Sequence, residues 1–193
     1  MQIDSVVRQD FDAVRIGPAP AELGGCWLQA IQFLPHPRDR VCDFFSDAFQ
    51  LEVITPPWLH FRVLTPAPIR IEAGTLIDYR LRLHGIPIRW QSRISIWEPP
   101  CRFVDEQMRG PYRRWYHEHT FENADGGTLC RDHVHYAVPG GRLIDALVVR
   151  RDLSKIFSYR QKKLRRLFTL PGTHATDSAK LTNSSLKLVE VIR

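Results

Sequence analysis

Hydrophobic residues recur every three or four positions along residues 142–168, and this spacing predicts an amphipathic helix. Pro139-Gly140-Gly141 precedes the segment and Pro171-Gly172 follows it, and both are expected to bound the helix because proline and glycine disfavour helical geometry. At about 1.5 Å per residue the helix would be about 40 Å long, so it needs an equally long apolar surface to pack against. The apolar positions are Leu143, Ile144, Leu147, Val148, Leu153, Ile156, Phe157, Leu164, Leu167 and Phe168.

Residues 27–138 follow a period of two instead, which is typical of strands with one buried face. The first predicted strand is Trp27–Leu34, and helical spacing at residues 38–46 and 48–53 then predicts two short helices. Six further strands are expected at residues 60–65, 75–84, 88–97, 102–109, 112–122 and 128–138. The turns between these six are short and rich in Gly, Pro and Asp, so neighbouring strands should be antiparallel.

This element order predicts an α+β fold in which a curved seven-stranded antiparallel sheet wraps its inner face around the long C-terminal helix. Such an arrangement buries both apolar surfaces and tends to leave a cavity between them, where a ligand binds. We expect the domain to cover residues 24–170. Residues 1–23 are interpreted as a loosely held N-terminal arm and residues 171–193 as a flexible tail.

The composition, with 44% hydrophobic and 25% charged residues, is typical of a soluble globular protein. No run approaches the roughly 18 apolar residues of a membrane-spanning helix. The first residues, MQIDSVVRQDFDAV, interleave polar and acidic groups where a secretory signal has a continuous apolar core, so a cytoplasmic location is expected.

The sequence lacks the motifs of common cofactor sites. Its four cysteines, Cys26, Cys42, Cys101 and Cys130, are isolated and are interpreted as reduced thiols. There is no G-x-S-x-G elbow, phosphate loop or dinucleotide fingerprint. We therefore expect no cofactor and no dedicated metal site.

The net charge of +6 is concentrated in the predicted C-terminal helix. Residues 142–168 contain nine basic and two acidic residues, which leaves the rest of the chain close to neutral. Basic residues near a helix C-terminus complement the macrodipole, so a solvated basic face is the simplest interpretation. Contact with an anionic membrane surface or an acidic partner is the alternative; no nucleic-acid partner is expected, because no nucleic-acid-binding motif accompanies the charge.

The last predicted hairpin carries the most informative polar residues. His117 and His119 share a strand face with the apolar Trp115, and Asp132 shares one with Val134 on the partner strand. If the two apolar faces coincide, His117 lies opposite Val134 and His119 lies opposite Asp132. The register therefore predicts two imidazoles and a carboxylate on the concave side of the sheet.

Three roles remain open for this group. The residues can form a buried polar patch that orients the polar head of a ligand. Alternatively, Asp132 can raise the basicity of His119 for acid/base catalysis, or His117 and His119 can chelate a metal together with Asp132. Glu106 is a further catalytic candidate, although alternation leaves open whether its face or that of Asp105 points inward. The cavity is expected to be lined by Tyr79, Trp90, Trp115, His117, His119, Val134 and Tyr136.

Several segments resemble the SRPBCC or START-like superfamily, which includes the birch pollen allergen and polyketide cyclase/dehydrase-like proteins. The segments are Leu34–Phe45, Leu51–Leu64, Gly74–Leu83, Trp97–Gln107 and Gly110–Phe121. They are most similar to bacterial ligand-binding SRPBCC proteins of unassigned function, and the resemblance covers about residues 25–168. It implies a helix-grip fold and the binding of apolar small molecules, but it supplies no established catalytic residues.

Together these observations predict a protein that binds a small lipid-like, aromatic or polyketide-like molecule between the sheet and the C-terminal helix. The rival hypothesis is a cyclase or dehydratase that uses His119 and Asp132 as acid/base groups. A third hypothesis is a membrane-surface or protein-partner adaptor that acts through its basic helix. The adaptor would be distinguished from the other two by the absence of a cavity.

Overall fold

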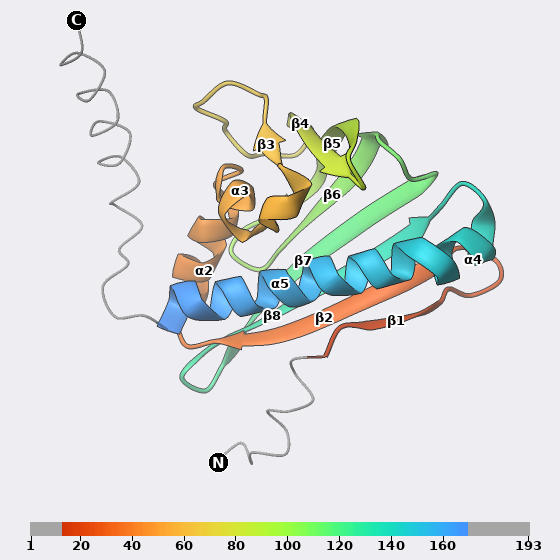
Figure 1. Ribbon diagram of the computed structural model, residues 1–193. Coiled ribbons are helices and arrows are strands. Elements are labelled where there is room, and N and C mark those ends of the chain that lie inside the picture. Colours follow the sequence, from red (N-terminus) through yellow and green to blue (C-terminus); the bar gives the residue numbers. More distant parts are fainter. Residues whose placement is uncertain (1–12, 170–193) are drawn as a thin grey trace, which may run out of the picture.

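A computed structural model describes residues 13–169 as an antiparallel eight-stranded sheet with helices on its concave face (Figure 1). The strands are β1 (Arg15–Pro18), β2 (Cys26–Leu34), β3 (Arg62–Val63), β4 (Leu76–Leu83), β5 (Ile86–Glu98), β6 (Arg102–Arg109), β7 (Arg114–Ala124) and β8 (Gly127–Ala137). They are arranged in the order β1-β2-β8-β7-β6-β5-β4-β3, so strands β3 to β8 are sequential neighbours. The predicted α+β architecture is thereby confirmed.

The helices follow the predicted order. Between β2 and β3 lie α2 (Arg38–Phe45), α3 (Gln50–Ile54) and the short 3₁₀ helix η1 (Pro57–Leu59). After β8 come α4 (Gly141–Ile144), the π-helical η2 (Asp145–Val149) and α5 (Arg150–Thr169). In Figure 1, α5 runs across the concave face of the sheet. None of the helices within residues 13–169 is long and apolar enough to cross a membrane.

The sheet has eight strands where seven were predicted, because β1 forms from residues assigned to the N-terminal arm. β1 pairs with β2, and Gly17 lies opposite Trp27. A Cβ atom at Gly17 would lie 2.6 Å from the Trp27 indole, so glycine permits the close approach. A strand of four residues, in which Gly17 is buried and Ile16 only half-buried, is too short to show a period of two. Residues 1–12 of the arm, and the predicted tail at 171–193, lie outside the described residues.

β5 gives the sheet much of its curvature. Its pairing with β6 shifts register between Gln91 and Ser92 and again between Ile94 and Ile96. Register shifts of this kind bend a strand and increase its local twist. In Figure 1, β4 and β5 curve away from the plane of β7 and β8 towards the helices.

The helix α5 is held on the sheet by apolar packing and by polar contacts that include a pair of hydrogen bonds to β2. Leu153 and Phe157 pack against β2, β7 and β8, while Leu164 and Phe168 pack near α2. The buried Gln161 donates from Nε2 to the Ile31 carbonyl of β2 over 3.1 Å, and Gln32 Nε2 donates to the Gln161 carbonyl over 2.8 Å. This reciprocal pair fixes α5 relative to β2.

The first turns of the predicted helix face solvent, contrary to their apolar pattern. Leu143 and Leu147 are 67% and 66% exposed, whereas the intervening Asp145 is buried. Asp145 accepts hydrogen bonds from the Tyr136 hydroxyl over 2.8 Å and from Cys26 Sγ over 3.2 Å. Because these polar contacts select the buried side of η2, the leucines at this end are turned outwards.

Candidate functional site

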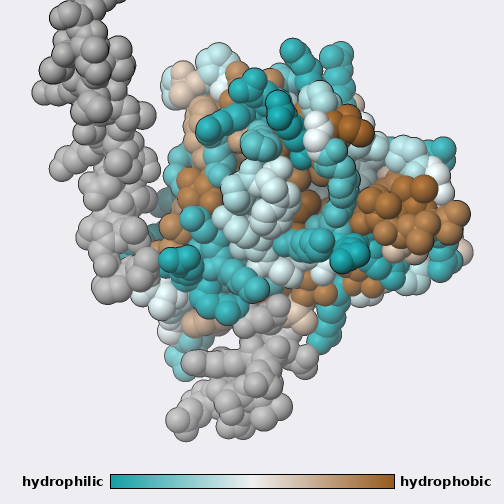
Figure 2. All heavy atoms as spheres, in the orientation of Figure 1, coloured by the Kyte–Doolittle hydropathy of each residue, from teal (hydrophilic) through white to brown (hydrophobic). Residues whose placement is uncertain are grey.

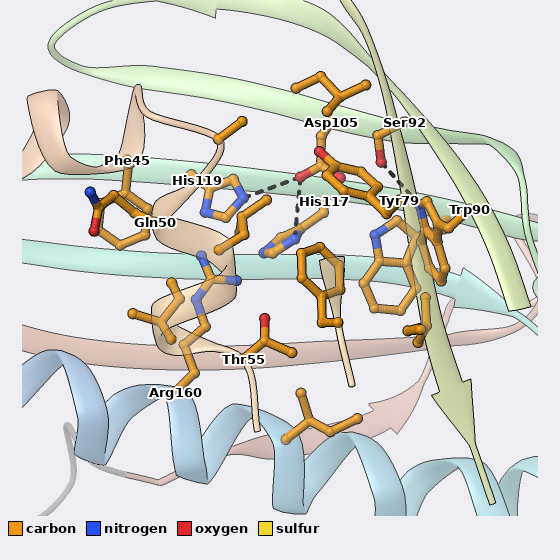
Figure 3. A pocket seen from close by; sticks show the side chains of 18 of the residues that line it. Phe45, Gln50, Thr55, Tyr79, Trp90, Ser92, Asp105, His117, His119 and Arg160 are labelled. Carbon is orange, nitrogen blue, oxygen red and sulfur yellow. Dashed lines mark hydrogen bonds and ion pairs between the residues drawn. The ribbon is translucent and has the colours of Figure 1, made fainter. Parts of the chain in front are cut away.

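A cavity of about 200 Å³ lies between the concave face of the sheet and helices α2, α3 and α5. Most of its wall is apolar, and many of the lining side chains are aromatic. These aromatic residues are Phe44, Phe45, Phe61, Tyr79, Trp90, Trp97, Phe103, Tyr112, Trp115 and Phe157. Asp105, His117, His119 and Arg160 gather on one side of the cavity (Figure 3).

Three adjacent strands and α5 position this polar group. In the ladder, Asp105 of β6 lies opposite His117 of β7, and His119 lies opposite Asp132 of β8. Since side chains alternate along a strand, both histidines point inward and Glu118 points outward, where it pairs with Arg102. The observed register of β7 and β8 is the one that the apolar faces predict.

Each imidazole bridges the two carboxylates. His117 places Nε2 3.0 Å from Asp132 Oδ1 and Nδ1 3.4 Å from Asp105 Oδ2. His119 places Nδ1 2.9 Å from Asp132 Oδ1 and Nε2 3.2 Å from Asp105 Oδ2. Both histidines are 4% exposed, so these contacts are shielded from water and their electrostatic effects are strong.

Arg160 of α5 reaches the group from the helix that faces the sheet (Figure 3). Its Nη2 atom is 3.9 Å from Asp132 Oδ1, and its guanidinium carbon lies 5.5 Å from the centre of the Phe45 ring. Within residues 13–169, the buried Nε and Nη2 atoms of Arg160 have no hydrogen-bond partner. A buried guanidinium with unused donors favours a ligand that brings an acceptor to it.

The cluster moves the pKa values of its two histidines apart. Burial and the neighbouring His119 lower the pKa of His117 to about 4. Burial acts in the same direction on His119, but hydrogen bonds to Asp105 and Asp132 outweigh it and raise the pKa of His119. At neutral pH His117 is therefore uncharged, whereas the cluster favours protonation of His119 over that of a free imidazole.

Both carboxylates stay ionised. Burial alone would raise their pKa values, but the Arg160 charge and hydrogen bonds from both imidazoles hold the pKa of Asp132 well below its usual value. The neighbouring His117 and His119 likewise lower the pKa of Asp105 against the effect of burial. The cluster can thus present both a proton donor and a proton acceptor at the edge of an apolar cavity.

The structure brings together five of the seven predicted lining residues: Tyr79, Trp90, Trp115, His117 and His119. Val134 and Tyr136 do not line the cavity. They are buried in the core formed with β2, Leu153 and Phe157, because α5 packs directly over this part of β8.

Glu106 points to the other side of the sheet and forms a 2.9 Å ion pair with Arg93. Its neighbour Asp105 faces the cavity instead, since it shares a strand face with the buried Phe103. The sequence left open whether Asp105 faces inward, and it did not identify Arg160 as a cavity residue. The inward position of Arg160 could have been predicted from helical spacing, because it lies three residues after Phe157 and four before Leu164, which are both buried.

Comparison with known proteins supports this architecture. The family model described as polyketide cyclase/dehydrase and lipid transport matches residues 34–156. A search of curated protein sequences gives no significant match.

Several solved structures share the fold. Protein Ms6760 from Mycobacterium smegmatis has a TM-score of 0.60 at 20% identity, covering 81% of this chain and 98% of that chain. TTHA0849 from Thermus thermophilus has a TM-score of 0.58 at 18% identity, covering 72% and 94%. The Zhui aromatase/cyclase from Streptomyces sp. R1128 has a TM-score of 0.54 at 15% identity, covering 76% and 98%. At these identities the likeness concerns the fold alone.

Proposed function

The chain belongs to the polyketide cyclase/dehydrase and lipid transport family, and on this premise we propose that it binds a small amphipathic molecule in the cavity between the sheet and α5. The molecule has an apolar, ring-containing or acyl body and one head group that accepts hydrogen bonds. The observation that carries this proposal is the unsatisfied guanidinium of Arg160 at the end of an otherwise aromatic cavity.

The size of the cavity limits the ligand. A dry engineered cavity of about 150 Å³ holds benzene. A volume of about 200 Å³ therefore fits a molecule of one or two rings, or a short acyl chain. Trp90 and Trp115 meet edge to face with ring centres 5.4 Å apart, which gives the ligand body a rigid aromatic wall.

Cyclase- or dehydratase-type chemistry is a second candidate function. The observation that favours it is the opposite pKa shift of two adjacent imidazoles, since paired groups with separated pKa values can divide acid and base roles. In this scheme neutral His117 accepts a proton from the ligand and cationic His119 donates one, while Asp105 and Asp132 hold both rings in place. The pair His119 and Asp132 proposed from the sequence is thus extended by His117 and Asp105.

The decisive experiment for the binding function is organic extraction of the purified full-length protein followed by mass spectrometry. We expect an amphipathic molecule in the extract that is absent from extracts of an Arg160→Leu variant. Incubation of the identified compound with the protein then separates the two candidates, because a binder releases it unchanged and an enzyme releases a product. Empty extracts, together with no binding of the two-ring amphipathic probe naphthalene-1-sulfonate, would contradict both.

A membrane-surface contact is a third candidate, supported by the face around α4 and η2. Figure 2 shows a hydrophobic patch there, and its exposed residues are Leu143, Ile144, Leu147 and Val148. The exposed Arg142 and Arg151 flank these residues in the sequence. Exposed leucines with adjacent arginines fit the interface of an anionic bilayer, where apolar side chains insert and cations meet headgroups. Such a contact would be a route for loading the ligand and is compatible with a cavity.

A further inference from the structure

We propose that Asp105, His117 and His119 form a binding site for one divalent transition-metal ion, such as Zn²⁺ or Fe²⁺, on the wall of the cavity. One ligand atom from each residue is available, and these three atoms lie within 4.8 Å of one another. Asp105 Oδ2 is 3.2 Å from His119 Nε2 and 3.4 Å from His117 Nδ1. Metal bonds of about 2.0–2.1 Å place neighbouring ligand atoms about 3 Å apart, so the two distances to Asp105 need little change.

Asp132 orients both imidazoles for this role. Its Oδ1 atom lies 3.0 Å from His117 Nε2 and 2.9 Å from His119 Nδ1, the two ring nitrogens that point away from Asp105. If each neutral imidazole donates its single N–H to Asp132, the lone pairs of the other two nitrogens face Asp105. A carboxylate that accepts the far N–H of a metal-binding histidine is the usual support of such a site.

This arrangement leaves three electron-pair donors facing one another. Asp105 Oδ2 and the two ring nitrogens repel each other unless a proton or a cation lies among them. Figure 3 shows one oxygen of Asp105 in contact with both rings. A shared proton is the competing occupant, and a metal ion would replace it.

The charge balance fits a divalent ion that retains an exchangeable ligand. Arg160 lies 3.9 Å from Asp132 and offsets the charge of that carboxylate. A divalent ion on Asp105 would then leave one net positive charge, which a hydroxide or the anionic head of a cavity ligand can neutralise. Two imidazoles and one carboxylate with open positions are characteristic of Fe²⁺ and of catalytic Zn²⁺ sites.

The test measures metal binding by the full-length protein after treatment with EDTA and removal of the chelator. Titration with Zn²⁺ by calorimetry and with Co²⁺ by visible absorption should give one ion per chain. Asp105→Asn should abolish binding, and Asp132→Asn should weaken it by about 10–100-fold. Glu118→Gln, on the opposite face of β7 between the two histidines, should leave it unchanged. If Asp105→Asn does not fold by circular dichroism, His119→Gln provides the same test.

Absence of stoichiometric Zn²⁺ and Co²⁺ binding in the wild type would overturn the metal site, as would equal affinity in the Asp105→Asn variant. Binding of naphthalene-1-sulfonate is measured in the same metal-free samples. Probe binding without metal binding rejects this site and keeps the proposed ligand cavity. Metal binding without probe binding supports the site and contradicts the proposed function.

Discussion

His117 and His119 lie on one face of β7 with their ring centres 3.8 Å apart, yet their pKa values move in opposite directions. The two rings contact the same pair of carboxylates, so the difference does not come from different partners. It arises because two adjacent buried imidazoles cannot both carry a charge at low cost. Whichever ring holds the proton suppresses protonation of the other, as in other coupled pairs.

The first prediction concerns Asp132 in metal-free protein. Asp132→Asn removes a negative charge 2.9 Å from His119 Nδ1 and should lower the pKa of His119. Glu118→Gln changes a carboxylate on the other face of β7 and should leave that pKa almost unmoved. NMR titration of the histidines in EDTA measures both. Equal responses to the two substitutions would contradict the placement of Asp132 beside the imidazoles.

The second prediction is that the cluster makes stability greatest near pH 6.5. The pKa of His117 is depressed to about 4 in the folded protein, so between about pH 6.5 and pH 4 the unfolded chain binds more protons and stability falls with pH. The pKa of His119 is raised in the folded protein, so its protonated imidazole stabilises the fold fully below about pH 6.5. This stabilisation is lost as pH rises through the pKa of His119 in the folded protein.

Urea denaturation at several pH values measures this dependence. Between about pH 6.5 and pH 4, protonation of His117 should lower the free energy of unfolding of the wild type by about 3 kcal/mol. His117→Gln should remove this part of the decline. His133→Gln, on the outer face of β8, is the matched control and should keep the wild-type profile. A wild-type profile in the His117 variant would mean that the imidazole is not held neutral by burial.

The third prediction tests the head-group contact. Arg160→Leu removes the unpaired donors and should weaken binding of the two-ring anionic probe naphthalene-1-sulfonate by about tenfold, because a charged hydrogen bond contributes roughly 1.5–3 kcal/mol. Lys162→Gln removes an exposed charge from the same helix and should have little effect. Fluorescence titration at two salt concentrations separates a buried contact from general attraction to the basic helix. Equal losses in both variants would assign the effect to the helix charge.

The sequence revealed the fold because long periodic segments dominate it. Every strand of eight residues or more was predicted, since its buried face repeats often enough to be recognised. β1 was missed, as four residues carry too few repeats, and its pairing depends on contact with β2. The outward turn of Leu143 and Leu147 was missed because Asp145 is held by residues distant in the sequence.

The candidate site was predicted in part for the same reason. His117, His119 and Asp132 lie on faces whose direction is set by Trp115 and Val134, so matching the apolar faces places all three. On β6 both alternating sets include apolar residues, and only the tertiary structure shows that Asp105 points inward and Glu106 outward. Which strand residues reach the cavity also depends on where α5 packs, and local periodicity does not contain that information.

The last prediction concerns the apolar patch on α4 and η2. Leu143 and Leu147 are about two-thirds exposed on the same side of this segment, and exposed leucines lower the free energy of the membrane-bound state when they insert into a bilayer. The double variant Leu143→Asn/Leu147→Asn should lose sedimentation with vesicles of phosphatidylcholine and phosphatidylserine while keeping its cavity probe binding. Leu76→Asn, which alters an exposed leucine of β4, is the matched control. Vesicles of phosphatidylcholine alone should bind the wild type weakly, because Arg142 and Arg151 then lack anionic headgroups. If the wild type instead forms dimers that the double variant dissolves, the patch is a contact between two copies of the chain and the membrane assignment is wrong.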